Sequence, residues 1–160
     1  MKKHNFHVTV TWTGNEGTGT KDYASYSRLH EIAADGKYAV VSGSSAPAFL
    51  GDASRYNPEE LFISSVASCH MLWYLHLCAD HGIVVTDYKD RAEGVVEMHQ
   101  DGGGRFTEVT LHPEVTITTE EKIEDANKLH AEANKKCFIA NSCNFKVLHK
   151  PKTIVEEPPL

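Results

Sequence analysis

The stretch Asn57-Pro-Glu-Glu-Leu-Phe-Ile-Ser-Ser-Val-Ala-Ser-Cys-His70 leads into the most apolar part of this 160-residue chain. Asn57 suits the N-cap of a helix, and the proline after it suits the first helical position. The two glutamates that follow favour the positive end of the helix dipole. Gly82 is of the kind that ends helices. We therefore predict one helix from Asn57 to Asp80 or His81.

Apolar residues occupy nearly the whole circumference of this predicted helix. They are Leu61, Phe62, Ile63, Val66, Ala67, Met71, Leu72, Trp73, Leu75 and Leu77. A helix that is apolar all round is buried on all sides. A 160-residue monomer can hardly enclose it, so we expect a second copy of the chain to supply part of the cover. Because serines and histidines interrupt the segment, we expect no membrane span.

Strand patterns precede and follow the helix. Apolar residues alternate with polar ones from Phe6 to Trp12, which predicts a half-buried strand. Asp35-Gly36 is a tight-turn signal that predicts a hairpin, and Gly102-Gly103-Gly104 predicts the tip of a second hairpin. The predicted strands cover residues 6–12, 23–33, 37–42, 86–99, 105–118 and 144–155.

A second helix is predicted after the fifth strand. The run Thr118-Thr119-Glu120-Glu121 has the pattern of a capping box. Downstream apolar and small residues then fall along one helical stripe that ends at Cys137. The element order β-β-β-α-β-β-α-β does not alternate strictly, so we predict an α+β fold with mostly antiparallel pairing. We expect a single domain over 1–160, with 155–160 as a frayed tail.

The charge and the cysteines restrict the function. A net charge of −6 argues against nucleic acid and anionic membranes as partners. Two lysines near the N-terminus precede no apolar segment, so we expect a cytoplasmic protein. In that compartment four cysteines favour catalysis or metal binding over structural disulfides. No metal-ligand spacing such as Cys-x-x-Cys or His-Glu-x-x-His is present, and we expect no metal and no cofactor.

Two of the four cysteines lie on the first predicted helix. Cys69 and Cys78 are nine residues apart, which is about 13 Å along a helix and on roughly opposite faces. A disulfide needs Cα atoms within about 7 Å, so these two cannot pair. Any partner of Cys69 must come from elsewhere, and Cys137 and Cys143 lie at and beyond the end of the second helix.

The segment from Asn57 to His70 resembles the signature of the OsmC/Ohr family of hydroperoxide-reducing proteins. In that family Asn-Pro-Glu-x-Leu leads to Ala-x-Cys in the middle of a long helix. The run Lys136-Cys-Phe-Ile-Ala-Asn-Ser142 resembles the family's second cysteine site, although Phe138 stands where many members have proline. The resemblance implies an intertwined homodimer, with the long helices at its centre and two equivalent active sites at the interface.

The family resemblance also implies a thiol peroxidase for oxidative-stress defence. Cys69 would attack an organic hydroperoxide, with hydrogen peroxide as a further candidate substrate, and become a sulfenic acid. Cys137 would close a disulfide onto it, which a small or protein-bound dithiol would reopen. Cys143 remains an alternative resolving thiol. Two other functions stay open: a redox-silent module that binds a small ligand, and a cysteine enzyme that acts on another electrophile.

The activating charge is less defined by sequence. Cys69 lies more than two turns inside its helix, where the dipole can hardly lower a thiol pKa. The family uses an arginine paired with a glutamate, and Glu59 matches that glutamate. Glu59 precedes Cys69 by ten residues, about 15 Å along a helix, so we expect Glu59 and its arginine to come from the partner chain. Arg28 is the first candidate for that arginine and Arg55 the second.

Apolar residues around the two motifs could line a pocket that favours organic hydroperoxides. Those that we expect there are Phe49, Phe62 and Phe138, with Arg55 at the substrate. His70 follows Cys69 directly, and we expect it to be a hydrogen-bonded core histidine.

Overall fold

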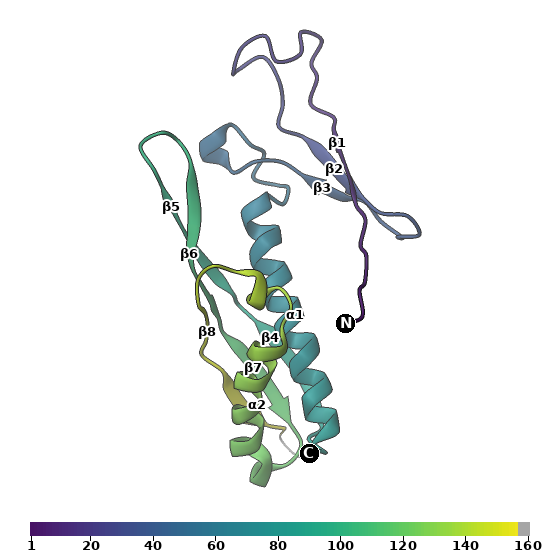
Figure 1. Cartoon of the computed structure of the whole chain (residues 1–160), viewed down its shortest axis with the longest axis vertical. Helices are drawn as coiled ribbons and strands as arrows, with labels where there is room; N and C mark the ends of the chain where they lie inside the picture. The colour runs from purple at the N-terminus through teal and green to yellow at the C-terminus, as the bar shows by residue number, and fades with distance from the viewer. Residues whose placement is uncertain (157–160) are drawn as a thin grey trace. The chain divides into compact units, whose positions relative to one another are not determined.

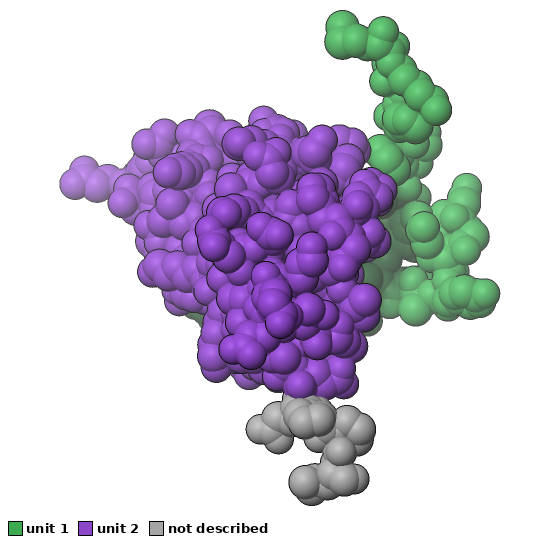
Figure 2. Space-filling model, turned by 90° about the horizontal axis from the view of Figure 1, so that it is seen from below, with its two compact units in different colours: residues 1–61 green, residues 62–160 purple. Residues whose placement is uncertain are grey.

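A computed structural model describes residues 1–156 of the chain. Figure 2 shows two compact units, of which the first covers residues 1–61 and the second begins at Phe62. Each unit is described by itself. The single domain expected over 1–160 stays a prediction.

The first unit contains one small antiparallel sheet in the order β1-β2-β3 (Figure 1). Its strands are β1 Thr9–Trp12, β2 His30–Ala33 and β3 Val41–Gly43. The hairpin predicted at Asp35-Gly36 is confirmed, and Gly36 adopts a positive φ of 74° that suits a tight turn. The predicted strand 23–33 is wrong in its first part, because β2 begins only at His30. Apolar side chains of β1, including Val10 and Trp12, remain exposed.

Helix α1, Pro58–Asp80, confirms the predicted helix at both ends. The Asn57 side chain accepts a hydrogen bond from the Glu60 N–H at 2.9 Å, and the Glu60 carboxylate accepts one from the Asn57 N–H at 3.1 Å. At the other end Gly82 has a φ of 65°, and the Ile83 N–H donates to the Cys78 carbonyl at 2.9 Å. This closes the helix with a Schellman motif.

Burial of α1 within one chain is limited to one stripe. The buried positions are Val66, His70, Tyr74, Leu77 and Cys78. Other apolar positions are half-buried or exposed, and Leu72 is 64% exposed. By length and composition alone α1 could cross a membrane, with a mean hydropathy of 1.4 over its most apolar window. The buried stripe packs into two apolar clusters with strands and with the second helix, as expected of a core helix.

The three long strands predicted after α1 are wrong in length, because the second unit has six shorter strands in their place. Each predicted strand divides in two, and its halves lie in different sheets, β4-β7-β9 and β5-β6-β8. Proline, which carries no N–H to donate, marks two of the breaks: Pro113 directly follows the first, and Pro151 lies within the second. The hairpin tip at Gly102-Gly103-Gly104 is confirmed by the antiparallel pairing of β5 with β6. The bounds are β4 Val85–Asp90, β5 Glu93–Met98, β6 Gly104–Leu111, β7 Pro113–Ile117, β8 Val147–His149 and β9 Lys152–Val155.

Helix α2, Ile123–Lys136, follows a 3₁₀ turn at Glu120–Lys122. The capping box predicted from Thr118 to Glu121 is wrong, because Thr119 is the N-cap of this turn and makes no side-chain cap hydrogen bond, and neither does Lys122, the N-cap of α2. Buried residues of α2 pack with those of α1 and β7 in one cluster. The frayed tail expected over 155–160 is corrected at its start, since Val155 belongs to β9 and the Glu156 N–H donates to the Ile117 carbonyl. Residues 157–160 lie outside the described part of the chain. The predicted α+β class is confirmed. In addition to the antiparallel pairs, β8 pairs in parallel with β6, and β9 pairs in parallel with β7.

Candidate active site

Cys69 and Cys137 are in contact in the second unit. Cys69 lies midway along α1 and is half-buried, whereas Cys137 is the C-cap residue of α2 and is fully buried. The two thiols lie close enough for each to affect the other's protonation. All four cysteines are free thiols. The structure therefore brings together two sulfur atoms that lie 68 positions apart in the sequence.

The loop after α2 holds Cys137 through its backbone. The Cys137 N–H still donates to the Ala133 carbonyl at 2.9 Å, but its ψ of 114° ends the helix there. The chain then turns back, so that the Ala140 N–H donates to the Cys137 sulfur at 3.3 Å. The Asn141 side chain donates to the Lys135 carbonyl at 2.9 Å and fastens the loop to the helix end. The fold therefore fixes this sulfur without a proline at Phe138.

The electrostatic setting of Cys137 is dominated by burial. Burial, together with the neighbouring Cys69 thiol, raises the pKa of Cys137 to about 11 against the opposing effect of the Ala140 N–H. Cys137 therefore keeps its proton at neutral pH. Such a pair is suited to a reaction in which Cys69 is the nucleophile and Cys137 enters later.

An exposed apolar surface lies beside this thiol pair. Trp73 of α1 meets Phe138 edge to face, with ring centroids 6.1 Å apart, and the Lys136 ammonium lies 5.5 Å from the Trp73 ring. Phe138 is 67% exposed. A shallow hollow of about 260 Å³ is lined by Leu72, Trp73 and His76. Of the predicted pocket residues, Phe138 belongs to this surface.

Phe62 lies in a different cluster. Its ring packs against Phe106 at 4.7 Å and Phe145 at 6.4 Å between centroids. These rings border a hollow of about 310 Å³ that Arg105 and Cys143 also line. The Cys143 thiol donates to the Ile139 carbonyl at 3.3 Å, and burial raises its pKa. Cys143 thus bonds to a backbone oxygen, whereas Cys137 lies next to Cys69.

A buried group of histidines adjoins the thiol pair and was only partly foreseen. His70 is buried and bonded to His130 of α2, Nε2 to Nδ1 at 3.0 Å, which confirms the predicted core histidine. His149 of β8 stacks on both rings at 5.8 and 6.2 Å between centroids. His130 falls on the apolar stripe of α2, which was the signal that could have identified its burial. Nothing in the sequence pattern pointed to His149.

The predicted residues of the first unit are each engaged locally. The Arg28 guanidinium lies over the rings of Tyr23 and Tyr26, 4.4 and 4.2 Å from their centroids, and donates to both backbone carbonyls. Arg55 pairs with Asp52 at 3.5 Å. Within residues 1–156 neither arginine forms an ion pair with Glu59, which is half-buried in the first turn of α1. The expected pair of Glu59 with an arginine from a second chain stays a prediction.

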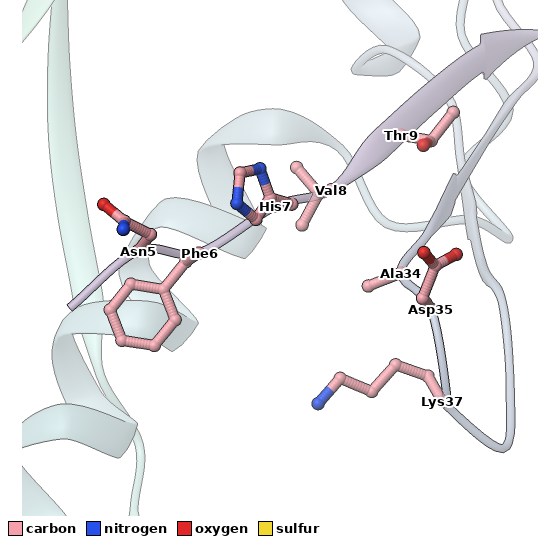
Figure 3. A pocket seen from close by; sticks show the side chains of 8 residues that line it. All are labelled: Asn5, Phe6, His7, Val8, Thr9, Ala34, Asp35 and Lys37. Carbon is pink, nitrogen blue, oxygen red and sulfur yellow. The ribbon is translucent and has the colours of Figure 1, made fainter.

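The first unit also contains Phe49, which was predicted to line a pocket, and a hollow of its own. Phe49 ends a 3₁₀ turn at Pro47–Phe49 and is exposed. A hollow of about 480 Å³ runs beside the N-terminal strand and the hairpin turn, as Figure 3 shows. It is lined by Asn5, Phe6, His7, Val8, Thr9, Ala34, Asp35 and Lys37. None of these side chains is a thiol or an arginine, so this hollow offers no chemistry for a peroxide.

Among the described residues no three histidine, cysteine, aspartate or glutamate side chains are grouped as a metal ion would require. Lys136, next to Cys137 in sequence, is the cation that the second unit places over Trp73.

Comparison with known proteins begins with a family model. The model of the family described as OsmC-like protein matches residues 51–150, which is more than half of the chain. A solved structure of an OsmC-like protein of unknown function from Vibrio cholerae is 30% identical. That match covers 95% of this chain and 100% of that chain, with a TM-score of 0.82.

More distant matches extend over most of the chain. A solved organic hydroperoxide resistance protein from Elizabethkingia anophelis is 18% identical, over 97% of this chain and 100% of that chain, with a TM-score of 0.66. At this identity the likeness shows the fold alone. The uncharacterized protein YmaD of Bacillus subtilis is 21% identical over 147 residues, which are 89% of this chain and 88% of that protein. Together these matches confirm the predicted OsmC-like fold.

Proposed function

Because this chain belongs to the family of OsmC-like proteins, we propose that it is a thiol-dependent peroxidase that reduces organic hydroperoxides with Cys69 and Cys137. The observation that carries the proposal is the proximity of these two free thiols, each close enough to affect the other's protonation. The fold shared with an organic hydroperoxide resistance protein supports the substrate class. No cofactor enters the reaction.

In the first step the Cys69 thiolate attacks the terminal oxygen of the hydroperoxide. A sulfur–oxygen bond forms, the oxygen–oxygen bond breaks, and the alkoxide leaves and takes up a proton as the alcohol. Cys69 is oxidised to a sulfenic acid. The exposed apolar surface of Leu72, Trp73 and Phe138 offers burial to the alkyl group of an organic hydroperoxide.

In the second step the Cys137 sulfur attacks the sulfur of the Cys69 sulfenic acid. The disulfide forms, and the hydroxyl group leaves with the Cys137 proton as water. A dithiol then opens the disulfide by exchange, which restores both thiols and leaves the reductant oxidised. The sum is one hydroperoxide and one dithiol converted to one alcohol, one water and one disulfide. We place this cycle in the cytoplasm, where dithiol reductants are available.

The thiolate of the first step needs a cation beside it. We assign that role to Arg28, with Arg55 as the alternative, held by Glu59 and supplied by the second chain of a homodimer. Exposed apolar residues on β1 and on α1 support such an assembly, because isolated soluble chains rarely leave large apolar surfaces uncovered. Dilution to the monomer should then abolish turnover, and an active monomer would refute the shared site.

Titration with tert-butyl hydroperoxide, followed by intact-mass and peptide mass spectrometry, tests the proposal. The wild type should lose about 2 Da, the two hydrogens given up when Cys69 and Cys137 join. Cys137→Ser should stop at a sulfenic acid on Cys69 that a dimedone-type reagent traps. Cys78→Ser, which removes a buried thiol from the same helix, should behave as the wild type.

Two outcomes would contradict the proposal. If the wild type stays unoxidised, the chain is a redox-silent binding module or acts on another electrophile. If Cys137→Ser still forms an intramolecular disulfide with Cys69, Cys143 is the resolving thiol and the assignment of Cys137 is wrong.

A further inference from the structure

The two helices that carry the cysteines are joined a second time inside the core. His70 is the residue after Cys69 on α1, and its Nε2 lies 3.0 Å from Nδ1 of His130 on α2. His130 precedes Cys137 by seven residues, about two helical turns. The two cross-helix contacts are thus adjacent on α1 and two turns apart on α2. Such an arrangement restricts both the sliding and the rotation of α2 against α1.

The bond between the two imidazoles requires a defined protonation state. One ring must donate an N–H and the other must accept with a lone pair, so the accepting ring is neutral. Burial lowers the pKa of His70 to about 4 and that of His130 to about 3. The groups that face the pair are Tyr74, whose ring stacks on His130 at 3.9 Å, and His149. None of them carries a negative charge that would favour an imidazolium.

The histidine pair is a poor device for stability alone. Nδ1 of His70 and Nε2 of His130 are buried and bond to no residue of the described chain. A half-satisfied buried polar pair costs stability compared with apolar residues of the same shape. What the histidines add is a directional contact that a pair of apolar rings lacks.

We propose that His70 and His130 are positioning residues whose hydrogen bond sets the register of α1 against α2, and thereby the rate at which Cys137 closes the disulfide onto Cys69. This inference rests on the proposed function. Closure of a disulfide needs the attacking sulfur in line behind the bond that breaks, so a small shift of α2 slows this step strongly. Attack on the hydroperoxide does not involve the Cys137 sulfur and therefore does not depend on the register of α2.

Rapid-quench kinetics with mass spectrometry separate the two steps by following thiol, sulfenic acid and disulfide. In His130→Phe the closing rate should fall about tenfold or more, as expected of a misplaced reacting group, while the rate of sulfenic acid formation changes less than about twofold. His130→Asn places an amide oxygen near the position of Nδ1 and should restore most of the closing rate. His149→Phe keeps the stacking, removes no bond of the pair and should close at the wild-type rate.

Each result supports or overturns the inference. An unchanged closing rate in His130→Phe, or an equal fall of both rates, overturns it. If His130→Phe does not fold, His70→Phe removes the same bond from α1 and is judged by the same rates, with His70→Gln as its rescue.

A second readout does not depend on peroxide. In glutathione redox buffers the dithiol–disulfide equilibrium of Cys69 and Cys137 reports how well the two sulfurs are placed. His130→Phe should shift it toward the dithiol, and no shift counts against the inference. If the wild type ignores hydroperoxides but this shift is present, the proposed function has failed and the positioning role stands.

Discussion

The two compact units differ in how far each completes its share of the proposed reaction. In the second unit, Cys69 and Cys137 are in contact within one chain, and a backbone loop and a histidine pair hold them there. In the first unit, Arg28 lies over tyrosine rings and Arg55 pairs with Asp52, so neither is bonded to Glu59. A single chain thus brings the two thiols together, whereas we propose that a second copy of the chain supplies the activating charge.

The largest expected effect removes the attacking sulfur. Cys69→Ser should lower hydroperoxide consumption in a dithiol-coupled assay by about a thousandfold or more, because a serine hydroxyl does not reduce a peroxide. Cys78→Ser is the matched control on the same helix and should retain full turnover. If Cys69→Ser keeps substantial activity, the second unit does not hold the redox centre and the comparison fails.

The next effect concerns the charge supplied by the first unit. Arg28→Gln should slow sulfenic acid formation by about ten- to a hundredfold at neutral pH, because an adjacent cation lowers a thiol pKa by about 1–3 units. The pH–rate profile should move toward alkaline pH by the corresponding amount. Arg91→Gln removes an exposed arginine between β4 and β5 and serves as the control. A larger loss in Arg55→Gln would transfer the role to Arg55.

Subunit complementation tests whether the Cys69 and the Arg28 of one active site come from different chains. Cys69→Ser and Arg28→Gln chains, each nearly inactive alone, are unfolded together and refolded. Half of the dimers are then mixed, and one of their two sites has both an intact Cys69 and an intact Arg28 from the other chain. Turnover should recover to about one quarter of the wild-type value per site. No recovery would place the arginine and the thiol in the same chain.

How much of this could be predicted depends on how local the signals were. Asn57, Gly82 and Asp35-Gly36 act on residues a few positions away, and the helix ends and the hairpin turn followed from them. The breaks of the long strands did not follow from local signals, because the alternation of apolar and polar residues continues through the bend at His112. The His112 N–H donates there to the Asp90 carboxylate, 22 residues away. The parallel pairing of β8 with β6 and of β9 with β7 likewise depends on strands that are distant in sequence.

For the site, the sequence alone excluded a Cys69–Cys78 bond but left both downstream thiols open. The family resemblance, not any spacing, pointed to Cys137. The bond of His70 to His130 depends on how two helices are rotated against each other, which no periodicity specifies. Arg28 was predicted to pair with a carboxylate, yet in the described chain two backbone carbonyls five or fewer residues away satisfy its guanidinium.

A pH dependence of stability should arise from the second unit. His70 and His130 stay neutral when folded down to about pH 4, whereas in the unfolded chain a histidine takes up its proton near pH 6.5. The unfolded state therefore binds more protons as the pH falls below 6.5, and stability is lost in that direction. Urea unfolding below pH 6.5 should show a loss for each histidine that steepens toward about 1.4 kcal/mol per pH unit near pH 5. The doubly substituted His70→Phe/His130→Phe chain should show a flatter profile, and an unchanged slope would contradict the burial of both rings as neutral groups.

The smallest expected effect lies at Asn57, where α1 begins. Asn57→Ala removes the cap of the Glu60 N–H and should lower the free energy of unfolding by about 1 kcal/mol. Fraying is confined to the first helical turn, and Cys69 lies about three turns further on. Disulfide closure with Cys137 should therefore keep its wild-type rate. Sulfenic acid formation is the informative quantity, because the first turn also carries Glu59. If sulfenic acid formation slows while closure does not, Glu59 positions the activating arginine. That result supports separate roles for the two units. If both steps slow together, the start of α1 positions Cys69 and Cys137 as well, and the two units do not have separate roles.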